Sequence, residues 1–194
     1  MIIEYKIDFF SFWICSAGFS PILGNKALAT KDSDGLPYIP GKTIKGILKE
    51  NVKKMIDWKY SGDDESQNCS RNMLKEACKS LFGCQTKTGT AHFSDATLPE
   101  EERSYIISTG TQRFLFFETA HQNSTNKQTY ELEVVIPCTL YGYIYIPSQT
   151  YNNISVITDL FHDSFGYIKR IGLHRKTGYG RCQIQMTNQP LNKE

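Results

Sequence analysis

Hydrophobic and polar positions alternate along the first fifteen residues of the chain. Ile3, Tyr5, Ile7 and Phe9 fall on one face of an extended backbone, and this period of two predicts a β-strand with one buried face. The segment from Ser16 to Gly41 is rich in glycine, proline, serine, aspartate and asparagine, which predicts a long irregular loop. Loops of this length in compact domains are often functional.

The clearest helix is expected to begin near Lys42. Apolar residues recur there every three or four positions, at Ile44, Ile47, Leu48, Val52 and Met55. This period predicts one buried stripe, with three lysines on the opposite side: Lys42, Lys49 and Lys53. The stretch from Tyr60 to Ser70 is polar and acidic, which predicts an exposed connecting segment, called here the excursion. A second, shorter helix is expected to follow from about Ser70 to Leu81.

After residue 83, the sequence pattern predicts mostly strands. Strands are expected at 92–95, 105–108, 113–118, 131–146 and 180–186, and one helix at 154–161. The polar segment from His121 to Thr129 is typical of a projecting hairpin tip. Strands and helices alternating at this size predict an α+β fold with a ferredoxin-like core and decorated loops.

The composition is that of one soluble globular domain. The 194 residues are 40% hydrophobic and 22% charged and include 11 Phe, 11 Tyr and 2 Trp, which argues against wholesale disorder. We find neither a membrane-spanning stretch nor a secretory signal, so we expect a cytoplasmic protein without a membrane partner. Its six cysteines are then expected to be thiols or metal ligands. With a net charge of only +2, nucleic-acid binding would have to rest on local basic patches.

The stretch from Gly35 to Lys49 joins a proline-held turn to the lysine-rich start of the first helix. Free backbone N–H groups and the helix dipole at such a start favour an anion such as phosphate, although an ordinary capped helix fits the same residues. Gly46 favours binding, because a mid-helix glycine costs roughly 1 kcal/mol against alanine and indicates a close approach. The candidate contacts are Gly41, Lys42, Thr43, Lys45 and Lys49.

A second basic stretch lies between Ile168 and Arg181. Five basic residues and three glycines occur there between two apolar segments. Flexible backbone beside this much charge favours a loop that lies against a sugar-phosphate chain, and Tyr179 is placed to stack on a base. An ordinary glycine-rich turn is the alternative. The candidate contacts are His174, Arg175, Lys176, Gly178, Tyr179 and Arg181.

Four motifs follow one another in a fixed order along the chain. They are Gly-Leu-Pro-Tyr-Ile-Pro-Gly-Lys-Thr-Ile-Lys-Gly at 35–46, Leu-Phe-Gly at 81–83, Phe-Ser-Asp-Ala at 93–96 and Gly-Leu-His-Arg-Lys-Thr-Gly-Tyr-Gly-Arg at 172–181. In this order they resemble the RAMP superfamily of CRISPR-associated proteins. The chain's size, its early loop and its segment from Glu131 to Thr139 are similar to the repeated backbone subunit of type III effector complexes.

The resemblance implies a modified ferredoxin-like fold, related to the RNA-recognition motif, with a projecting thumb hairpin. By position the thumb is Gly110–Thr129, including Arg113, and Tyr60–Cys84 is an inserted lid or knuckle segment of the single domain. Copies of such a subunit stack into a filament along a CRISPR guide RNA. The implied partners are guide RNA, target RNA, copies of the chain and other type III effector subunits.

The resemblance also implies that an aspartate in the early loop supports Mg²⁺-dependent cleavage of paired target RNA. Asp32 is our candidate and Asp34 the alternative, although the family places this aspartate about one residue further from the turn. A carboxylate there can bind Mg²⁺ or orient a 2′-hydroxyl for in-line attack, but a loop aspartate also commonly caps backbone N–H groups. A subunit without cleavage, and a histidine-dependent guide-processing endoribonuclease, therefore stay open; the remaining histidines are His121, His162 and His174.

Three cysteines and a histidine form a candidate zinc site: Cys69, Cys78, Cys84 and His92. Several type III backbone subunits carry a small zinc knuckle near the Leu-Phe-Gly motif, and this ligand set suits tetrahedral Zn²⁺. The spacing lacks a close pair of cysteines, however, and Cys78 falls on the apolar face of its helix, where a buried thiol is the ordinary explanation. Both interpretations stay open.

Overall fold

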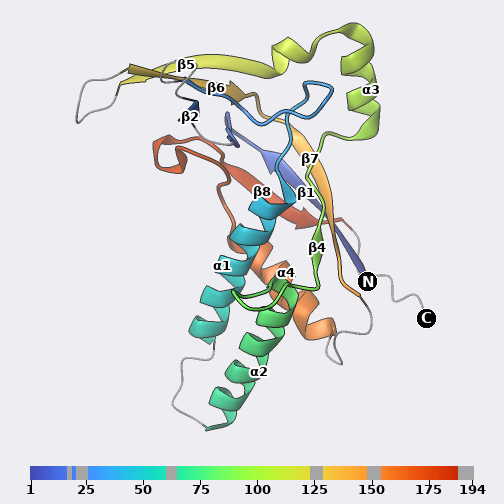
Figure 1. The fold of residues 1–194 in the computed structure, drawn as a ribbon, viewed down its shortest axis with the longest axis vertical. Coiled ribbons are helices and arrows are strands. Elements are labelled where there is room, and N and C mark those ends of the chain that lie inside the picture. The colour runs from blue at the N-terminus through green and yellow to red at the C-terminus, as the bar shows by residue number, and fades with distance from the viewer. Residues whose placement is uncertain (17–18, 21–25, 60–64, 123–128, 148–153, 188–194) are drawn as a thin grey trace.

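The computed structural model describes residues 1–16, 19–20, 26–59, 65–122, 129–147 and 154–187 (Figure 1). Parts of three expected segments fall outside these ranges: the early loop, the excursion after the first helix and the tip of the hairpin. Six elements make up the central layer, and they follow one another as β-α-β-β-α-β. They are β1 (Ile2–Phe9), α1 (Gly41–Lys59), β4 (His92–Phe93), β7 (Thr139–Tyr145), α4 (Ile154–Tyr167) and β8 (Cys182–Met186).

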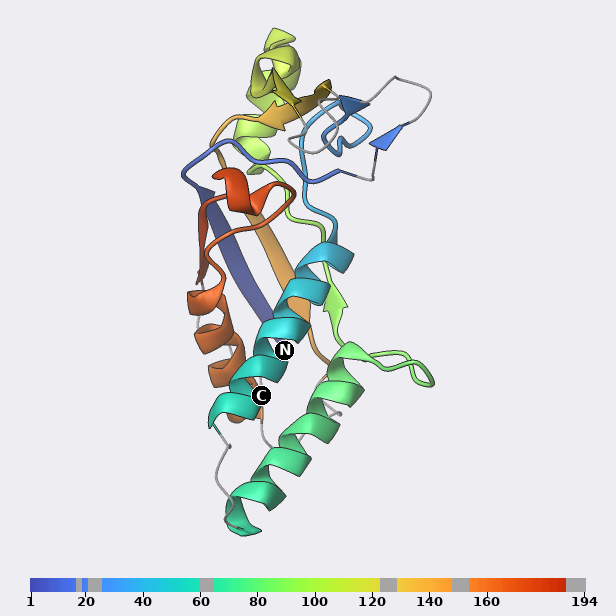
Figure 2. The same cartoon turned by 90° about the vertical axis from the view of Figure 1, so that its left-hand side faces the viewer.

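The four strands of this layer form one antiparallel sheet in the order β4-β7-β1-β8. The first strand thus lies between the third and the fourth, which is the ferredoxin-like arrangement. Helices α1 and α4 contact each other and cover one face of the sheet (Figure 2). The predicted α+β class and ferredoxin-like core are therefore confirmed.

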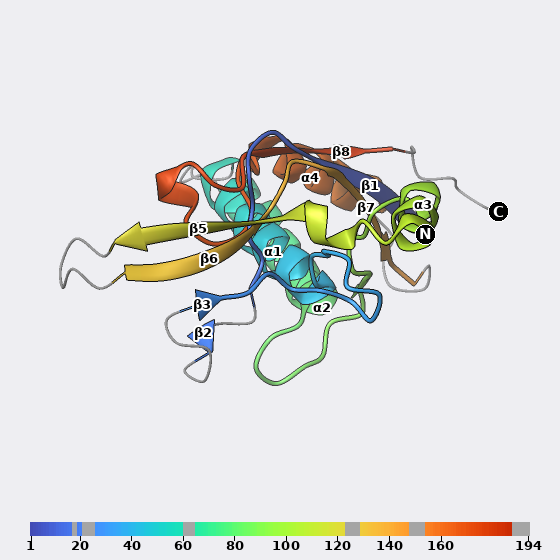
Figure 3. The ribbon, with the colours of Figure 1, turned by 90° about the horizontal axis from the view of Figure 1, so that it is seen from above.

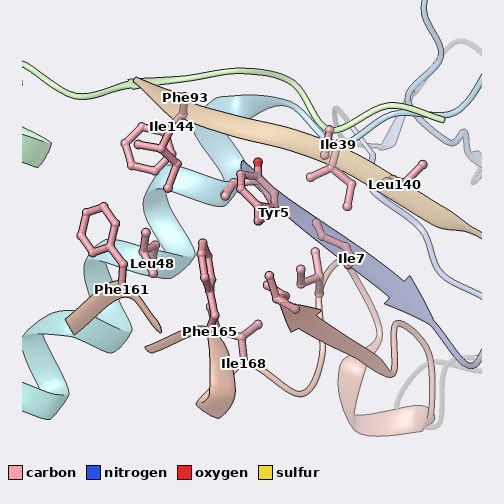
Figure 4. Close-up of a cluster of buried hydrophobic side chains, with 14 of the residues drawn as sticks. Tyr5, Ile7, Ile39, Leu48, Phe93, Leu140, Ile144, Phe161, Phe165 and Ile168 are labelled. Atoms are coloured by element: carbon pink, nitrogen blue, oxygen red, sulfur yellow. The ribbon is translucent and has the colours of Figure 1, made fainter. Parts of the chain in front are cut away.

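The core lies between this sheet and its two helices. Burial alternates along β1, where Ile3, Tyr5 and Ile7 are fully buried, as the period of two predicts. Leu48 on α1 and Phe165 on α4 meet them from the helical side (Figure 4). The apolar stripe predicted for the first helix is thus the face that packs on the sheet.

A second sheet carries the projecting hairpin. Its strand order is β2-β3-β6-β5, and the antiparallel pair β5 and β6 extends to one side of the molecule (Figure 3). Residues 123–128, which join the two strands, lie outside the described ranges. The strands are β2 (Phe19–Ser20), β3 (Lys26–Ala27), β5 (Phe116–Gln122) and β6 (Thr129–Val135).

The predicted strand at 105–108 is wrong, because this segment belongs to helix α3 (Glu100–Thr109). Three glutamates in its first turn complement the positive end of the helix dipole. Gly110 ends the helix in a left-handed conformation, as is common for helix ends. The glutamates at the start of the helix and Gly110 at its end outweigh the preference of Ile106 and Ile107 for strands. A short 3-10 helix, η2 (Gln112–Leu115), then leads into β5.

The predicted single strand at 131–146 is also wrong, because it is two strands in different sheets. The chain leaves β6 at Val135 and enters β7 at Thr139, with Pro137 between them. Proline lacks the N–H that a strand interior needs, so the break falls there.

Helix α2 (Glu65–Phe82) begins earlier than the predicted 70–81 and packs on α1. The expected excursion is therefore shorter than its sequence indicates, and residues 60–64 of it lie outside the description. None of the helices in the described part of the chain combines the length and the apolar character of a membrane span.

Candidate nucleic-acid interface

The glycine-rich stretch before β8 forms a loop that is tied down at both ends. The N–H of Leu173 donates to the carbonyl of Ile14 at 2.9 Å, and that of Gly180 donates to Phe12 at 2.8 Å. Gly180 has a φ of +69°, and a Cβ there would overlap the carbonyl oxygen of Ile171. Two of the three glycines, Gly172 and Gly180, therefore serve close packing, whereas a Cβ on Gly178 would meet nothing within 4 Å.

The apex of the loop displays positive charge. His174 has a left-handed φ of 53° and opens the short turn η4 (Arg175–Thr177), which the N–H of Thr177 closes on the carbonyl of His174 at 3.0 Å. Arg175 and Lys176 are exposed. Two cations are thus held outward on a fixed backbone, which reduces the ordering cost of binding a phosphate chain.

Tyr179 joins the loop to the hairpin sheet. Its ring is half-buried and packs on a small cluster formed by Ile14, Ala27, Leu132 and Val134, and its hydroxyl lies 3.5 Å from that of Thr119 on β5. The sequence predicts that this ring stacks on a nucleobase, whereas the structure packs it against the hairpin sheet. The loop and the hairpin lie on the same side of the molecule (Figures 1 and 3).

The start of α1 is capped by the chain itself. The N–H of Gly41 donates to Oδ1 of Asp95 at 2.7 Å, and a Cβ on Gly41 would overlap the carbonyl oxygen of Phe93. Gly41 is therefore buried against β4, and a carboxylate already occupies the place predicted for a phosphate. The Phe-Ser-Asp-Ala motif is in this structure a helix cap supplied from a distance. The N–H of Gly41 is thus already paired within the chain, and an anion site at this helix start stays a prediction.

The other candidates on α1 have different surroundings. Thr43 hydrogen-bonds the Cys15 thiol, Lys45 Nζ lies 6.0 Å from the centre of the Phe93 ring, and Lys49 donates to the carbonyl of Gly83 at 2.7 Å. Lys42 is exposed. The last candidate feature, Gly46, is exposed, and a Cβ there would meet nothing within 4 Å. Packing against the described residues therefore does not explain this glycine.

The exposed face of α1 lies near the apex of the basic loop. The pKa of Glu50 on this face is lowered chiefly by the hydrogen bond from Lys54, and the charge of Arg175 lowers it further. Arg175 acts on Glu50 only through its charge, and this is the last of the causes. The basic loop lies on the same side of α1 as the hairpin (Figures 1 and 3).

Arg113 is not brought to this surface. It lies on η2, which precedes β5. Its guanidinium covers the ring of Phe114, 4.8 Å from the ring centre. The predicted thumb residues Gly110–Thr129 therefore include two parts, a helix end at Gly110 and a hairpin strand that begins at Phe116.

The candidate catalytic aspartates are held by an arginine from α3. Oδ1 of Asp32 accepts the N–H groups of Asp34 at 3.0 Å and Leu36 at 2.9 Å. Its Oδ2 accepts Nη1 of Arg103 at 2.7 Å, and Nη2 of the same guanidinium reaches Asp34 at 2.9 Å. Asp32 is thus both a turn former and one end of an ion pair that fastens the early loop to α3.

These contacts determine the ionisation of Asp32. Burial by itself raises the pKa of this carboxyl, but the hydrogen bonds from Arg103, Leu36 and Asp34 and the charge of Arg103 outweigh it, so the pKa lies below its ordinary value of 3.8. The carboxylate is charged at neutral pH. The guanidinium, however, holds the position that a cation would take, so this arrangement does not fit a Mg²⁺ ion.

The predicted zinc ligands are not brought together. Cys69 and Cys78 lie nine residues apart on α2, which is about 13 Å along a helix. Among the residues that the structure describes, no group of three or more His, Cys, Asp or Glu side chains can hold a metal ion. Burial raises the pKa of the Cys78 thiol to about 11, whereas Cys69 and Cys84 are exposed and His92 begins β4.

The histidines occupy separate parts of the structure. His174 packs edge-on against Tyr179, with ring centres 6.5 Å apart, and Nδ1 of His162 on α4 lies 3.6 Å from Asp163. The side chain of His121 lies outside the description. The placement of His162 and His174 therefore does not favour a pair of histidines for acid and base catalysis.

Comparisons with known proteins agree with this architecture. A model of the RAMP superfamily matches residues 6–183. Among solved structures, a chain of the type III-B Cmr-beta complex bound to cognate target RNA has a TM-score of 0.69 at 8% identity, covering 96% of this chain and 97% of that one. A chain of a type IV-B CRISPR complex has a TM-score of 0.68 at 13% identity, covering 100% and 93%. A search of curated proteins gives no match.

Proposed function

The chain belongs to the RAMP superfamily, and from this premise we propose that it is a guide-RNA-binding subunit of a CRISPR effector complex. The observation that carries the proposal is the basic loop apex at Arg175 and Lys176. The loop that carries them is tied by backbone hydrogen bonds to the segment after β1, and its Tyr179 packs toward the hairpin. Cations on a rigid support bind phosphates without reading base sequence.

Within such a complex, we place the chain as a backbone subunit of a type III system. Its partners are then the guide RNA, the paired target RNA, further copies of the chain in a filament and other effector subunits. The projecting hairpin supports this role, because it extends away from the central layer on the side of the loop (Figure 3). A hairpin in that position can reach a neighbouring subunit or separate nucleotides of a bound strand.

The geometry at Asp32 favours a subunit without cleavage over one that cuts target RNA. The three hydrogen bonds that described residues donate to its carboxylate are structural, and Arg103 supplies the positive charge that a metal ion would bring. Cleavage through Asp32 or Asp34 is the second candidate, supported by the position of the early loop in the family. It would require Arg103 to release these carboxylates.

Replacing Arg175 and Lys176 together with alanine is expected to weaken the binding of single-stranded RNA, equally for all sequences. The slope of log affinity against log salt should fall by about 0.7 for each phosphate contact that is lost. Fluorescence anisotropy with a labelled RNA at several salt concentrations measures both quantities. Both side chains are exposed, so the variant should fold normally.

The matched control is a double alanine variant of Lys79 and Lys87, which are exposed near the end of α2 and beyond it. It removes the same charge from another part of the surface, so its affinity and its salt slope should stay close to the wild-type values. Equal effects of the two variants would contradict the proposed surface, and would show that only net charge matters.

A further inference from the structure

Three segments of the chain meet at the root of the basic loop. Phe10 follows β1, and its N–H donates to the carbonyl of Arg181 at 2.8 Å. Arg170 is paired with Arg181, and the N–H of Cys182 donates to the carbonyl of Lys169 at 3.0 Å. Between them is a hollow of about 400 Å³, which we call the basic hollow. Its lining residues are Phe10, Lys169, Arg170, Arg181, Cys182 and Gln183.

The lining of the basic hollow contains three cations and no acid. Among the described residues, neither Lys169 nor Arg181 forms an ion pair, and Arg170 is held by its hydrogen bond to the carbonyl of Arg175. Asp8, the strand partner of Gln183, has its carboxylate engaged by Lys6 at 3.1 Å and Thr139 at 2.9 Å. The charge of the hollow therefore favours an anion.

An exposed aromatic ring completes the basic hollow. Phe10 is 56% exposed, although its neighbour Phe9 is buried and stacks on Trp13 at 4.6 Å. An exposed ring beside cations is the combination by which proteins bind single-stranded nucleic acid, with the base on the ring and the phosphate on the charge. The volume is at the lower end of ligand sites, which span about 300–1,000 Å³, and suits one nucleotide rather than several.

We propose that the basic hollow is a nucleotide subsite that takes one residue of single-stranded RNA, with its base stacked on Phe10 and its phosphate between Lys169 and Arg181. This inference rests on the proposed RNA-binding function and adds a contact at the root of the loop to those at its apex. Recognition there is independent of base identity, because every base offers a face for stacking. Arg170 links the two places, since it lines the hollow while its guanidinium holds the apex carbonyl.

The test uses tryptophan fluorescence in the full chain. A Phe10→Trp substitution in a Trp58→Phe background leaves the new indole as the exposed reporter, because Trp13 is buried. Addition of a uridine oligonucleotide should quench this reporter as the base stacks on it. The matched control carries Tyr167→Trp in the same background; this position on α4 is similarly exposed, at 59%, and its emission should not change.

A second variant, Lys169→Gln with Arg181→Gln, tests the phosphate contact. It should weaken RNA binding at least fivefold, flatten the salt slope and abolish the quench when it is combined with the Phe10→Trp reporter. RNA binding of normal affinity without any quench of the reporter would overturn the subsite and leave the loop-apex proposal intact. An unchanged affinity in the double glutamine variant would also overturn it. Failure of the wild-type chain to bind the oligonucleotide would overturn both proposals.

Discussion

Replacing Gly180 with alanine is expected to lower the free energy of unfolding by about 3 kcal/mol, through backbone strain and overpacking together. The new Cβ would overlap the carbonyl oxygen of Ile171, a backbone atom that cannot move away as a flexible side chain could, and the φ of +69° adds strain. Urea denaturation followed by circular dichroism measures the change.

Gly178 offers the matched control for this substitution. Its φ is +102°, but a Cβ there would meet nothing within 4 Å. A Gly178→Ala variant should therefore lose only about 1 kcal/mol, from the backbone conformation alone. Equal losses at the two positions would show that conformation, rather than the close approach to Ile171, determines the need for glycine in this loop.

Removing the charge at Asp32 is expected to destabilise the chain by about 2 kcal/mol, the range of a partly buried hydrogen bond to a charged group. An Asp32→Asn variant keeps an oxygen for the N–H groups of Asp34 and Leu36, so it isolates the ion pair with Arg103. The control is Glu50→Gln, which removes one partner of the exposed pair with Lys54 and should change stability little.

The effect of Asp32→Asn should depend on pH. Because the pKa of Asp32 is lower in the folded chain than its ordinary 3.8, its stabilisation is complete above that pH and is lost as the pH falls through the folded value. The difference between wild type and variant should therefore shrink below pH 3.8. If the stability difference between wild type and Asp32→Asn stayed constant below pH 3.8, the ion pair with Arg103 would not be its cause.

The same variant separates the two candidate functions. If this subunit does not cleave, any cleavage of paired target RNA by the assembled effector complex should continue at the wild-type rate when the subunit carries Asp32→Asn. A complete loss of cleavage, with guide RNA still bound, would instead assign catalysis to Asp32.

The sequence predicts the central layer well because its signals are local. The period of two in β1 and the apolar stripe of α1 each reflect a single buried face, and the structure confirms both. Helix α3 is harder to predict, because its interior contains Tyr105, Ile106 and Ile107, which prefer strands. Its end signals, the glutamates at 100–102 and Gly110, are the better guide.

The site is only partly predictable, since its decisive contacts join distant parts of the chain. Asp95 caps Gly41 from 54 positions away, and Arg103 reaches Asp32 across 71. Neither pairing has a local pattern that one sequence reveals. The Phe-Ser-Asp-Ala motif draws attention to Asp95 but does not indicate that Gly41 is its partner. No sequence pattern indicates that Arg103 pairs with Asp32.

The lining of the basic hollow escapes sequence analysis for the same reason. Lys169, Arg170 and Phe10 are not among the predicted binding residues, although Lys169 and Arg170 belong to the second basic stretch. Their meeting with Phe10 depends on the backbone pairing around Arg181, which joins the end of β1 to the root of the loop.

The central claim is that a single RNA strand lies along the basic loop, between the hairpin and the exposed face of α1. Ultraviolet cross-linking of the chain to a uridine oligonucleotide, followed by mass spectrometry, tests it most directly. The account predicts cross-linked peptides from the loop around Arg175, from β5 and from the α1 face around Gly46. Cross-links confined to α2 or to the outer surface of α4 would contradict it.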